Sequence, residues 1–388
     1  MYKKKMKEIL SLVEKNHIDM YFNISKEELD EYVDLIFDEN NICNEYDFNY
    51  YSNVIFKKVF GRFDSHTKLA FDLHDLYLGL KFKYIDNKLF IIRTTEEDIE
   101  LLYGEVISID GVNIDKLVNE IENMTCYSTE GFLIQQIEMS LNNIKKLKSL
   151  PSINSSHDEF EFSILKDEKV INKKFGVSDC DFIDLNKPKE NYSYDVIEDK
   201  IIITYNSCSE KQENQMINFV NEIKNVSSST DINKFIVDLR GNSGGNSSII
   251  KPLIEFLSDK EVVTLVDQYV FSSGRFAIFD LKNINSVFVG SDIGTTMNCF
   301  GNSPIFKYEN FLVPISNKYF YMDRLCDEFR EFKTKEELEA AKNNNEIFIP
   351  QIFEVDHYCK NSIVDIKSGR DKELEVAINC FDSKKVKC

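Results

Sequence analysis

Near-continuous apolar runs in the second half of the chain constrain its fold more than any other sequence feature. The runs cover residues 200–206, 234–239, 262–267 and 287–290. Helical patterns over residues 210–226, 247–258 and 273–283 alternate with them. Strands that are apolar on both faces are typical of a mostly parallel sheet that helices cover on both sides. The sequence therefore predicts an α/β core over residues 195–388.

A helical region is predicted before this core, over residues 1–62. Apolar side chains recur there at helical spacing, for example Leu29, Val33 and Ile36. Ser25, with Glu28 three positions later, forms the pattern of a capping box that marks a helix start.

The segment between these two regions, residues 63–194, is predicted to be rich in strands. A short apolar strand, a tight Asp110–Gly111 turn and a helix from Ile114 follow one another. A second helix is expected over residues 129–147. Further strands are expected over residues 69–73, 78–82, 89–93, 160–165 and 173–177, with a turn near His74–Asp75. In the later core, residues 333–346 predict a charged helix inserted on the surface.

Composition narrows the classes of function. The 388 residues suggest roughly two to three domains. The formal net charge of −19 disfavours nucleic acids and anionic membrane surfaces as partners. No apolar run approaches the ~18 residues of a membrane-spanning helix, and the N-terminus shows no secretory signal. Nine scattered Cys residues favour reduced thiols, so we expect a cytoplasmic protein.

A glycine-rich turn, DLRGNSGGNSS over residues 238–248, joins an apolar strand to a helix. Its glycines allow positive φ angles, so backbone N–H groups can point outward together and stabilise negative charge. The negative group is either a phosphate or a transient oxyanion. No GK[ST] sequence follows, which argues against a nucleotide-binding P-loop. A tight strand–helix connection without a ligand is the simpler alternative.

The same turn contains the nucleophile-elbow pattern G-x-S-x-G, with Ser243 at its centre. Asp323 and His357 follow in the order expected of an α/β-hydrolase esterase. However, the chain lacks an HGGG-type oxyanion segment, and Ser243 lies farther from the strand end than an elbow serine should. The esterase reading is therefore a lesser alternative.

A second serine candidate lies in the sequence FSSGR, residues 271–275, between a strand and a helix. Ser272 and Ser273 could simply cap that helix. A serine acts as a nucleophile only if a base removes its proton. Among five His residues, His66 lies where a loop leads into a strand, whereas His17 is read as a surface residue on a helix.

Several motifs together resemble the C-terminal processing, or tail-specific, serine protease family, and within it the branch of the tricorn core protease. The motifs are DSHT at 64–67, GEVISIDGVNI at 104–114, DLRGNSGG at 238–245 and FSSGR at 271–275. They occur in the family's order, and the resemblance covers most of residues 60–380. That ordered set is more specific than any single motif.

The resemblance implies a set of catalytic roles. It makes Ser272 the nucleophile and His66 the general base. Ser65 precedes the base and is expected to orient the site through its hydroxyl. An imidazole titrates near neutrality, so it can take the serine proton and return it to the leaving amine.

The resemblance also implies a crotonase-like core, a PDZ-like module over about residues 85–165, and an oxyanion hole. Gly244 and Gly245, with the backbone N–H of Ser273, are expected to form that hole. The implied reaction is hydrolysis of peptide bonds through an acyl-enzyme, without cofactor or metal. The expected substrate is a short peptide or an unstructured protein tail.

The sequence departs from the family pattern at specific places. Residues 290–301 contain no Lys, so the Ser–Lys dyad of some members is not expected. Arg275 stands where the family has Glu. An acidic residue should orient the site, and Asp323 and Glu346 are the candidates. These departures leave a second hypothesis open, a pseudo-protease that binds peptide ends without cutting them.

Overall fold

The fold was analysed in a computed structural model, which describes residues 1–72, 76–178, 190–212, 214–323, 328–342 and 348–383. Its central feature is a six-stranded sheet in the order β18-β12-β11-β10-β9-β8. The strands are β8 (Tyr192–Ile197), β9 (Lys200–Tyr205), β10 (Lys234–Asp238), β11 (Glu261–Val266), β12 (Val287–Gly290) and β18 (His357–Tyr358). All neighbours pair in parallel except β8 with β9. The predicted α/β core is confirmed.

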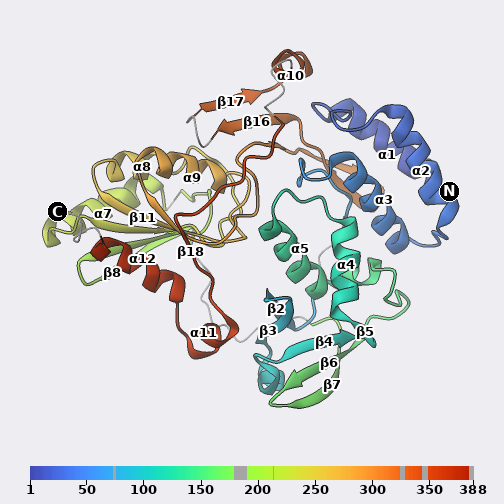
Figure 1. The fold of residues 1–388 in the computed structure, drawn as a ribbon, viewed down its shortest axis with the longest axis horizontal. Helices are drawn as coiled ribbons and strands as arrows, with labels where there is room; N and C mark the ends of the chain where they lie inside the picture. The colour runs from blue at the N-terminus through green and yellow to red at the C-terminus, as the bar shows by residue number, and fades with distance from the viewer. Residues whose placement is uncertain (73–75, 179–189, 213, 324–327, 343–347, 384–388) are drawn as a thin grey trace.

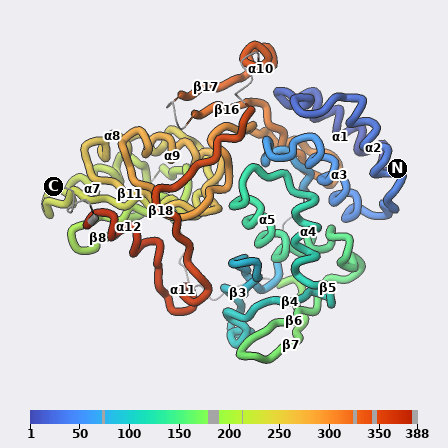
Figure 2. The backbone as a smooth tube through the Cα atoms, in the orientation of Figure 1, coloured from blue at the N-terminus to red at the C-terminus, as the bar shows by residue number. Residues whose placement is uncertain are grey.

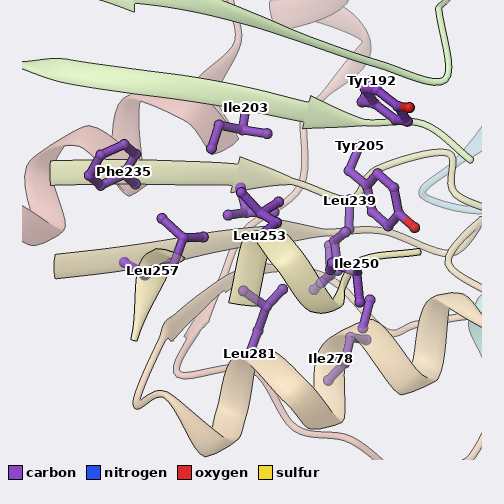
Figure 3. Close-up of a cluster of buried hydrophobic side chains, with 14 of the residues drawn as sticks. Tyr192, Ile203, Tyr205, Phe235, Leu239, Ile250, Leu253, Leu257, Ile278 and Leu281 are labelled. Carbon is purple, nitrogen blue, oxygen red and sulfur yellow. The ribbon is translucent and has the colours of Figure 1, made fainter. Parts of the chain in front are cut away.

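Helices cover both faces of this sheet (Figure 1). The first face carries α7 (Met216–Thr230), α8 (Lys251–Leu257) and α9 (Gly274–Asn283), and the second carries α12 (Lys372–Ser383). Side chains alternate accordingly: Ile203 packs toward α7–α9, whereas Ile202 packs toward α12. Figure 3 shows Ile203 and Phe235 of the strands facing Leu253 and Leu281 of the helices. Burying each such side chain contributes roughly 1.5–3 kcal/mol, which explains the two-sided apolar strands.

Two of these helices begin later than the sequence pattern predicts. Helix α8 begins at Lys251 rather than near residue 247. The Asn246 side chain accepts hydrogen bonds from the backbone N–H and the hydroxyl of Ser248, which holds a turn there instead. Helix α7 begins at Met216, later than the predicted residue 210.

The middle segment forms an antiparallel sheet in the order β2-β3-β4-β6-β7, with β5 paired to β4. The strands are β2 (Leu80–Ile85), β3 (Lys88–Thr94), β4 (Glu105–Ile109), β5 (Val112–Asn113), β6 (Phe160–Lys166) and β7 (Lys169–Phe175). A 3-10 helix, η1 (Glu96–Leu101), precedes β4. Asp110 and Gly111 have φ of 50° and 74°, as the predicted tight turn between β4 and β5 requires.

Helices α4 (Ile114–Met124), α5 (Glu130–Asn142) and α6 (Ile144–Ser149) share a hydrophobic core with this sheet. The prediction of one helix over residues 129–147 is wrong. Asn143 ends α5 in an extended conformation, and its side chain accepts a hydrogen bond from Lys146 N–H as the N-cap of α6.

The N-terminal region is helical, as predicted, with α1 (Tyr2–Asn16), α2 (Lys26–Glu39) and α3 (Glu45–Phe60). The capping box of Ser25 and Glu28 is present. These helices pack on a small sheet of β1 (Ala70–Phe71), β15 (Phe311–Pro314) and β14 (Ile305–Tyr308). Figure 2 shows the blue N-terminal helices beside this orange late segment. The predicted strand over 69–73 is reduced to β1, and the turn near His74–Asp75 lies outside the described residues.

A three-stranded sheet stands above the core in Figure 1, formed by β13 (Cys299–Gly301), β16 (Lys318–Asp323) and β17 (Glu328–Phe332). The predicted charged helix is α10 (Lys335–Lys342), whose Leu338 is buried against Phe300 and Tyr319. This helix is therefore anchored rather than loosely inserted. Helix α11 (Ile363–Ser368) precedes α12. Within the described residues, no helix combines the length and hydropathy that crossing a membrane requires.

Candidate active site

The glycine-rich turn after β10 is held open by its own backbone geometry. Gly244 and Gly245 have φ of 106° and 134°. A Cβ on Gly245 would lie 2.3 Å from the carbonyl oxygen of Cys208, so no other residue fits there without a shift. The conformational freedom expected of these glycines is thus used at both positions.

Asn242 ties this turn to the neighbouring strand ends. Its side chain is fully buried. The Nδ2 group donates to the carbonyl of Tyr205, at the end of β9, over 2.8 Å. Its Oδ1 atom accepts hydrogen bonds from Gly244 N–H at 3.0 Å and from the Cys208 thiol at 3.4 Å. One buried amide therefore fixes the position of the turn.

Ser272 lies directly against the turn, at the start of α9. A Cβ on Gly244 would approach the Ser272 Cβ to 3.0 Å and the Ser273 nitrogen to 2.7 Å. Ser272 has φ of 50°, a left-handed conformation that costs a non-glycine residue on the order of 1–3 kcal/mol and often marks a functional position. The turn and Ser272 come together because each follows the carboxyl end of one of two adjacent parallel strands.

Simple helix capping does not account for the two serines. Ser273 is the N-cap residue of α9, but its side chain makes no capping hydrogen bond. Its hydroxyl instead donates to the carbonyl of Gly245 at 2.7 Å. The Ser273 hydroxyl therefore does not cap α9, as the sequence predicted. It joins the start of α9 to the glycine turn instead.

The backbone amides of the glycine turn and of Ser273 differ in whether they already have an acceptor. Across the part of the chain that the structure describes, the N–H groups of Gly245 and Ser273 donate to no acceptor. The N–H group of Gly244 is engaged by Asn242. Of the expected oxyanion donors, Gly245 and Ser273 thus have amides ready to bind a negative oxygen, whereas that of Gly244 is occupied.

His66 lies beside the serine-bearing loop, although it comes from the loop after α3. Its ring centroid is 4.6 Å from that of Phe271, the residue before Ser272. A Cβ on Gly301 would lie 3.7 Å from its Cε1 atom. Both ring nitrogens are buried; Nδ1 lies 3.9 Å from the Asp64 carboxylate, and the backbone of Phe300 also interacts with the ring. The fold thus places His66, the expected base, against Phe271, which directly precedes the expected nucleophile Ser272.

The surroundings of His66 favour its neutral form. Burial lowers the pKa of His66 to about 4, the Asp64 carboxylate opposes this shift, and the positive charges of Arg275 and Lys68 add to it. The imidazole is therefore unprotonated near neutral pH and able to accept a proton.

Asp64 is a fully buried hydrogen-bond centre that holds the His66 loop. Its carboxylate accepts hydrogen bonds from the backbone N–H of His66 at 2.8 Å and from the hydroxyl of Ser316 at 3.0 Å. His17 Nε2 lies 3.1 Å from it, and Thr67 donates through both its N–H and its hydroxyl. Burial alone would raise the pKa of Asp64, but the hydrogen bonds from His17 and Thr67 hold it well below its usual range.

The predicted surface position of His17 is wrong. Its side chain is completely buried, directly after the end of α1. Its ring also packs against Phe60 and Phe300. The motif DSHT could have hinted that Asp64 needs a partner, but nothing in the sequence pattern points to a residue 47 positions earlier.

Arg275, which replaces the family's Glu, is almost fully buried beside this site. Its guanidinium carbon lies 5.1 Å from the ring centroid of Phe276 and 5.3 Å from that of Phe320. Its Nη1 group donates to the Cys299 sulfur, and its Nε atom has no partner within the described structure. A buried cation therefore acts on the electrostatics of His66, which sequence reasoning noted only as a departure.

The remaining predicted residues lie elsewhere or outside the description. Ser65 is buried, and its hydroxyl finds no partner among the described atoms. Asp323, at the end of β16, accepts a hydrogen bond from Tyr321 at 3.1 Å. Gly301, where a Cβ would lie 3.7 Å from the His66 ring, pairs with Lys318 at the other end of that strand, five residues and roughly 16 Å from Asp323 at 3.3 Å per residue. Glu346 lies outside the described residues.

The esterase alternative loses its base. His357 is exposed on β18, which is separated from β10 by β11 and β12. Three strand spacings of about 4.8 Å put β18 roughly 14 Å from β10, the strand that leads to Ser243. The structure does not bring Ser243 and His357 together. Among the described residues, no group of three or more His, Cys, Asp or Glu is arranged to hold a metal ion.

Comparison with known families identifies one matching family. The model of peptidase family S41 matches residues 201–275. Over this segment the chain is similar to peptidase family S41. The matched S41 segment runs from β9 to the start of α9, so it contains the glycine turn, Ser272 and Arg275 but not His66. A search of curated proteins found no match.

Solved structures share the fold of this chain along nearly its whole length. The crystal structure of a CPAF mutant has a TM-score of 0.65 at 9% identity, and the match covers 95% of this chain and 94% of that one. Mature CPAF complexed with lactacystin has a TM-score of 0.60 at 10% identity, with 98% of each chain covered. At such low identity the likeness shows the fold alone, here a mixed α/β fold.

Proposed function

We propose that this chain is a serine endopeptidase that cleaves peptide bonds through an acyl-enzyme, with Ser272 as nucleophile and His66 as base. One observation carries the proposal. A serine in a strained left-handed conformation lies against a glycine turn, and a neutral imidazole packs on the preceding residue. This is the set of groups that acyl transfer needs.

In the proposed reaction, neutral His66 takes the proton of the Ser272 hydroxyl as its Oγ attacks the peptide carbonyl carbon. The amides of Gly245 and Ser273 stabilise the resulting oxyanion, and losing one such donor typically costs about 3–4 kcal/mol. The imidazolium then protonates the leaving amine as the C–N bond breaks. Water hydrolyses the acyl-enzyme by the same route and regenerates the serine.

We also propose a substrate, a module and a location for this protein. The substrate would be a peptide or an unstructured protein tail, which can add to a sheet as an extended strand. The PDZ-like identity of residues 85–165, an orienting role for Ser65, Asp323 or Glu346, and a cytoplasmic location also stay predictions. No step of the proposed mechanism calls for a metal or a cofactor.

Labelling by a fluorophosphonate, which reacts with activated serines, tests the proposal. The wild-type protein should be labelled at Ser272, and both Ser272→Ala and His66→Ala should abolish labelling. Ser243→Ala is the matched control, because Ser243 is an exposed serine of the same turn. Peptide-library cleavage should follow the same pattern. Labelling that survives in Ser272→Ala, or is lost only in Ser243→Ala, contradicts the proposal.

One observation favours the second hypothesis, the non-cutting peptide binder. The Gly244 amide, one of the expected oxyanion donors, is occupied by Asn242. A site in this state can hold a peptide without activating Ser272. Tight peptide binding without any fluorophosphonate label would favour the binder over the peptidase.

A further inference from the structure

A cavity of about 370 Å³ has Phe132 among its lining residues. It is bounded by α3, α5, the start of β1 and the loop that carries His66. Ser65, Lys68, Cys126, Phe132, Lys145 and Lys146 are among the residues that line it. The mechanism described above assigns no role to this cavity.

Contacts between aromatic rings connect the cavity with the proposed catalytic site. The ring of Phe132, in the cavity wall, stacks on Phe271 with centroids 5.0 Å apart. Phe271 in turn contacts the ring of His66 and immediately precedes Ser272. Two ring contacts therefore link the cavity wall to the segment that carries Ser272, so a peptide bound at Ser272 is the ligand to consider for this cavity.

The cavity is basic, in a chain whose net charge is −19. Lys68, Lys145 and Lys146 line it, and none of its described lining residues is acidic. Lys68 is accessible to solvent, yet surrounding protein lowers the pKa of its ammonium group through desolvation. A lysine in the wall of a pocket has both properties, since its ammonium group reaches solvent while protein surrounds its side chain. Among the described residues, Lys68 forms no ion pair.

The chain that carries Lys68 is fixed in place before any ligand binds. The side chains of Asn49 and Asn53, on α3, donate to the carbonyl of Leu69 at 3.1 and 2.9 Å. The Asn53 Oδ1 atom accepts a hydrogen bond from the Leu69 N–H at 2.9 Å. A rigid backbone beside the cation reduces the entropy lost when an anion binds.

An orphan hydroxyl gives a second, independent sign of a ligand. Ser65 is 6% exposed and lines the cavity. Its Oγ atom is buried and has no hydrogen-bond partner among the described residues. A buried polar group that stays unsatisfied costs roughly 1–3 kcal/mol, so a bound acceptor would recover that loss.

We propose that this cavity is a subsite that binds a carboxylate of the peptide substrate, through the Lys68 ammonium and the Ser65 hydroxyl. The carboxylate comes either from an Asp or Glu side chain or from the peptide's C-terminus, since both present the same two oxygens. The volume suits one or two residues rather than a folded partner. The inference rests on the proposed peptide substrate, but it does not require that the bond be cut.

Binding to the Ser272→Ala protein tests the subsite without relying on catalysis. Fluorescein-labelled peptides that contain Asp or Glu are compared, by anisotropy, with otherwise identical Asn or Gln peptides, each with a free or an amidated C-terminus. Carboxylate peptides should bind roughly tenfold more tightly or better, because hydrogen bonds to charged groups are among the stronger ones. The side-chain and C-terminal arms identify the source of the carboxylate.

Variants then locate the effect. Lys68→Met should remove most of the preference for carboxylate peptides, Lys68→Arg should retain it, and Ser65→Ala should weaken it less. Lys116→Met, which alters an exposed lysine on α4, is the matched control and should change nothing. In the Ser272→Ala protein with its cavity residues unchanged, increasing salt should weaken the binding of the carboxylate peptides. This measurement does not depend on a lysine variant.

Equal affinity for carboxylate and amide peptides, or no binding of either, overturns the subsite. An equal loss for both peptide types in Lys68→Met overturns it as well. Failure of the proposed function has a different signature. In that case the wild-type protein escapes fluorophosphonate labelling, while the carboxylate preference of the Ser272→Ala protein persists.

Discussion

The Nε2 atom of His17 lies 3.1 Å from the carboxylate of Asp64, and both side chains are completely buried. The Nδ1 atom of the same ring accepts a hydrogen bond from the backbone N–H of Asp19, so Nε2 carries the proton and donates it to Asp64. Asp64 in turn holds the backbone N–H of His66. The N-terminal helical region thus positions the loop that carries the proposed base.

Replacing Asp64 by Asn should destabilise the protein by roughly 2–4 kcal/mol, because buried donors lose their charged acceptor. Since the pKa of Asp64 is lowered on folding, its contribution is present above the unfolded pKa near 4 and is lost as pH falls below that value. The difference between the two proteins, measured by urea unfolding, should therefore shrink below about pH 4. Asp38→Asn, at an exposed ion pair with Lys3, is the control and should cost little.

If Asp64→Asn unfolded at the same urea concentration as the wild type at neutral pH, Asp64 would not have this stabilising role. A loss that stayed constant down to pH 3 would also argue against an ionised Asp64 as the source of the effect.

The sequence predicts those parts of this architecture that depend on local patterns. Strands β9–β12 are recognisable because both faces are apolar, and their parallel arrangement brings Gly244 and Ser272 to one sheet edge. Single polar residues that end one helix and begin another cannot be recognised in the same way. Asn143 divides one predicted helix into two through a single side-chain hydrogen bond, which hydrophobic periodicity cannot reveal.

Long-range polar contacts are the other part that the sequence could not supply. His17 continues an amphipathic helix pattern and yet lies in the interior, because Asp64 satisfies it across 47 positions. Arg275 follows the serine motif and is nevertheless buried, held by aromatic rings that come from α9 and β16. A charged residue is normally placed on the surface, so only tertiary structure identifies these exceptions.

Asn242→Ala should lower the free energy of unfolding by roughly 2–4 kcal/mol. The substitution leaves the Tyr205 carbonyl and the Gly244 N–H without their partner in the interior, at about 1–3 kcal/mol each. Fluorophosphonate labelling of Ser272 should fall as well, because the glycine turn is no longer fixed. Asn246→Ala, at an exposed turn on the same segment, provides the comparison. Equal stability of Asn242→Ala and wild type would refute the anchoring role.

Gly245→Ala should be far more damaging than Gly241→Ala. Both glycines have positive φ, 134° and 82°, so both substitutions carry a backbone penalty of about 1–3 kcal/mol. Only Gly245 has a carbonyl oxygen 2.3 Å from the position of the new methyl group, whereas nothing lies within 4 Å at Gly241. Thermal unfolding and labelling rates should therefore separate the two variants, and similar values for both would show that the contact with Cys208 is not tight.

The acid limb of Ser272 labelling should report the titration of His66. The pKa of His66 is lowered to about 4, mainly by burial, and Arg275 contributes to the lowering. Above that pH the imidazole is neutral and can act as base, and below it the protonated ring cannot, so the rate constant should fall through a midpoint near pH 4. Removing the buried charge in Arg275→Met should move the midpoint to higher pH, whereas Arg275→Lys should leave it closer to that of the wild type.

The same pKa shift affects stability with a defined sign. The unfolded chain binds a proton at His66 below about pH 6.5, while the folded chain does not do so until about pH 4. Stability should therefore decline as pH falls from 6.5 to 4, and His66→Gln should flatten that decline. An NMR titration of the His66 Cε1 proton measures the pKa without any activity. A midpoint near 6.5 in the folded protein, unchanged by Arg275→Met, would show that neither burial nor Arg275 sets the protonation of this ring.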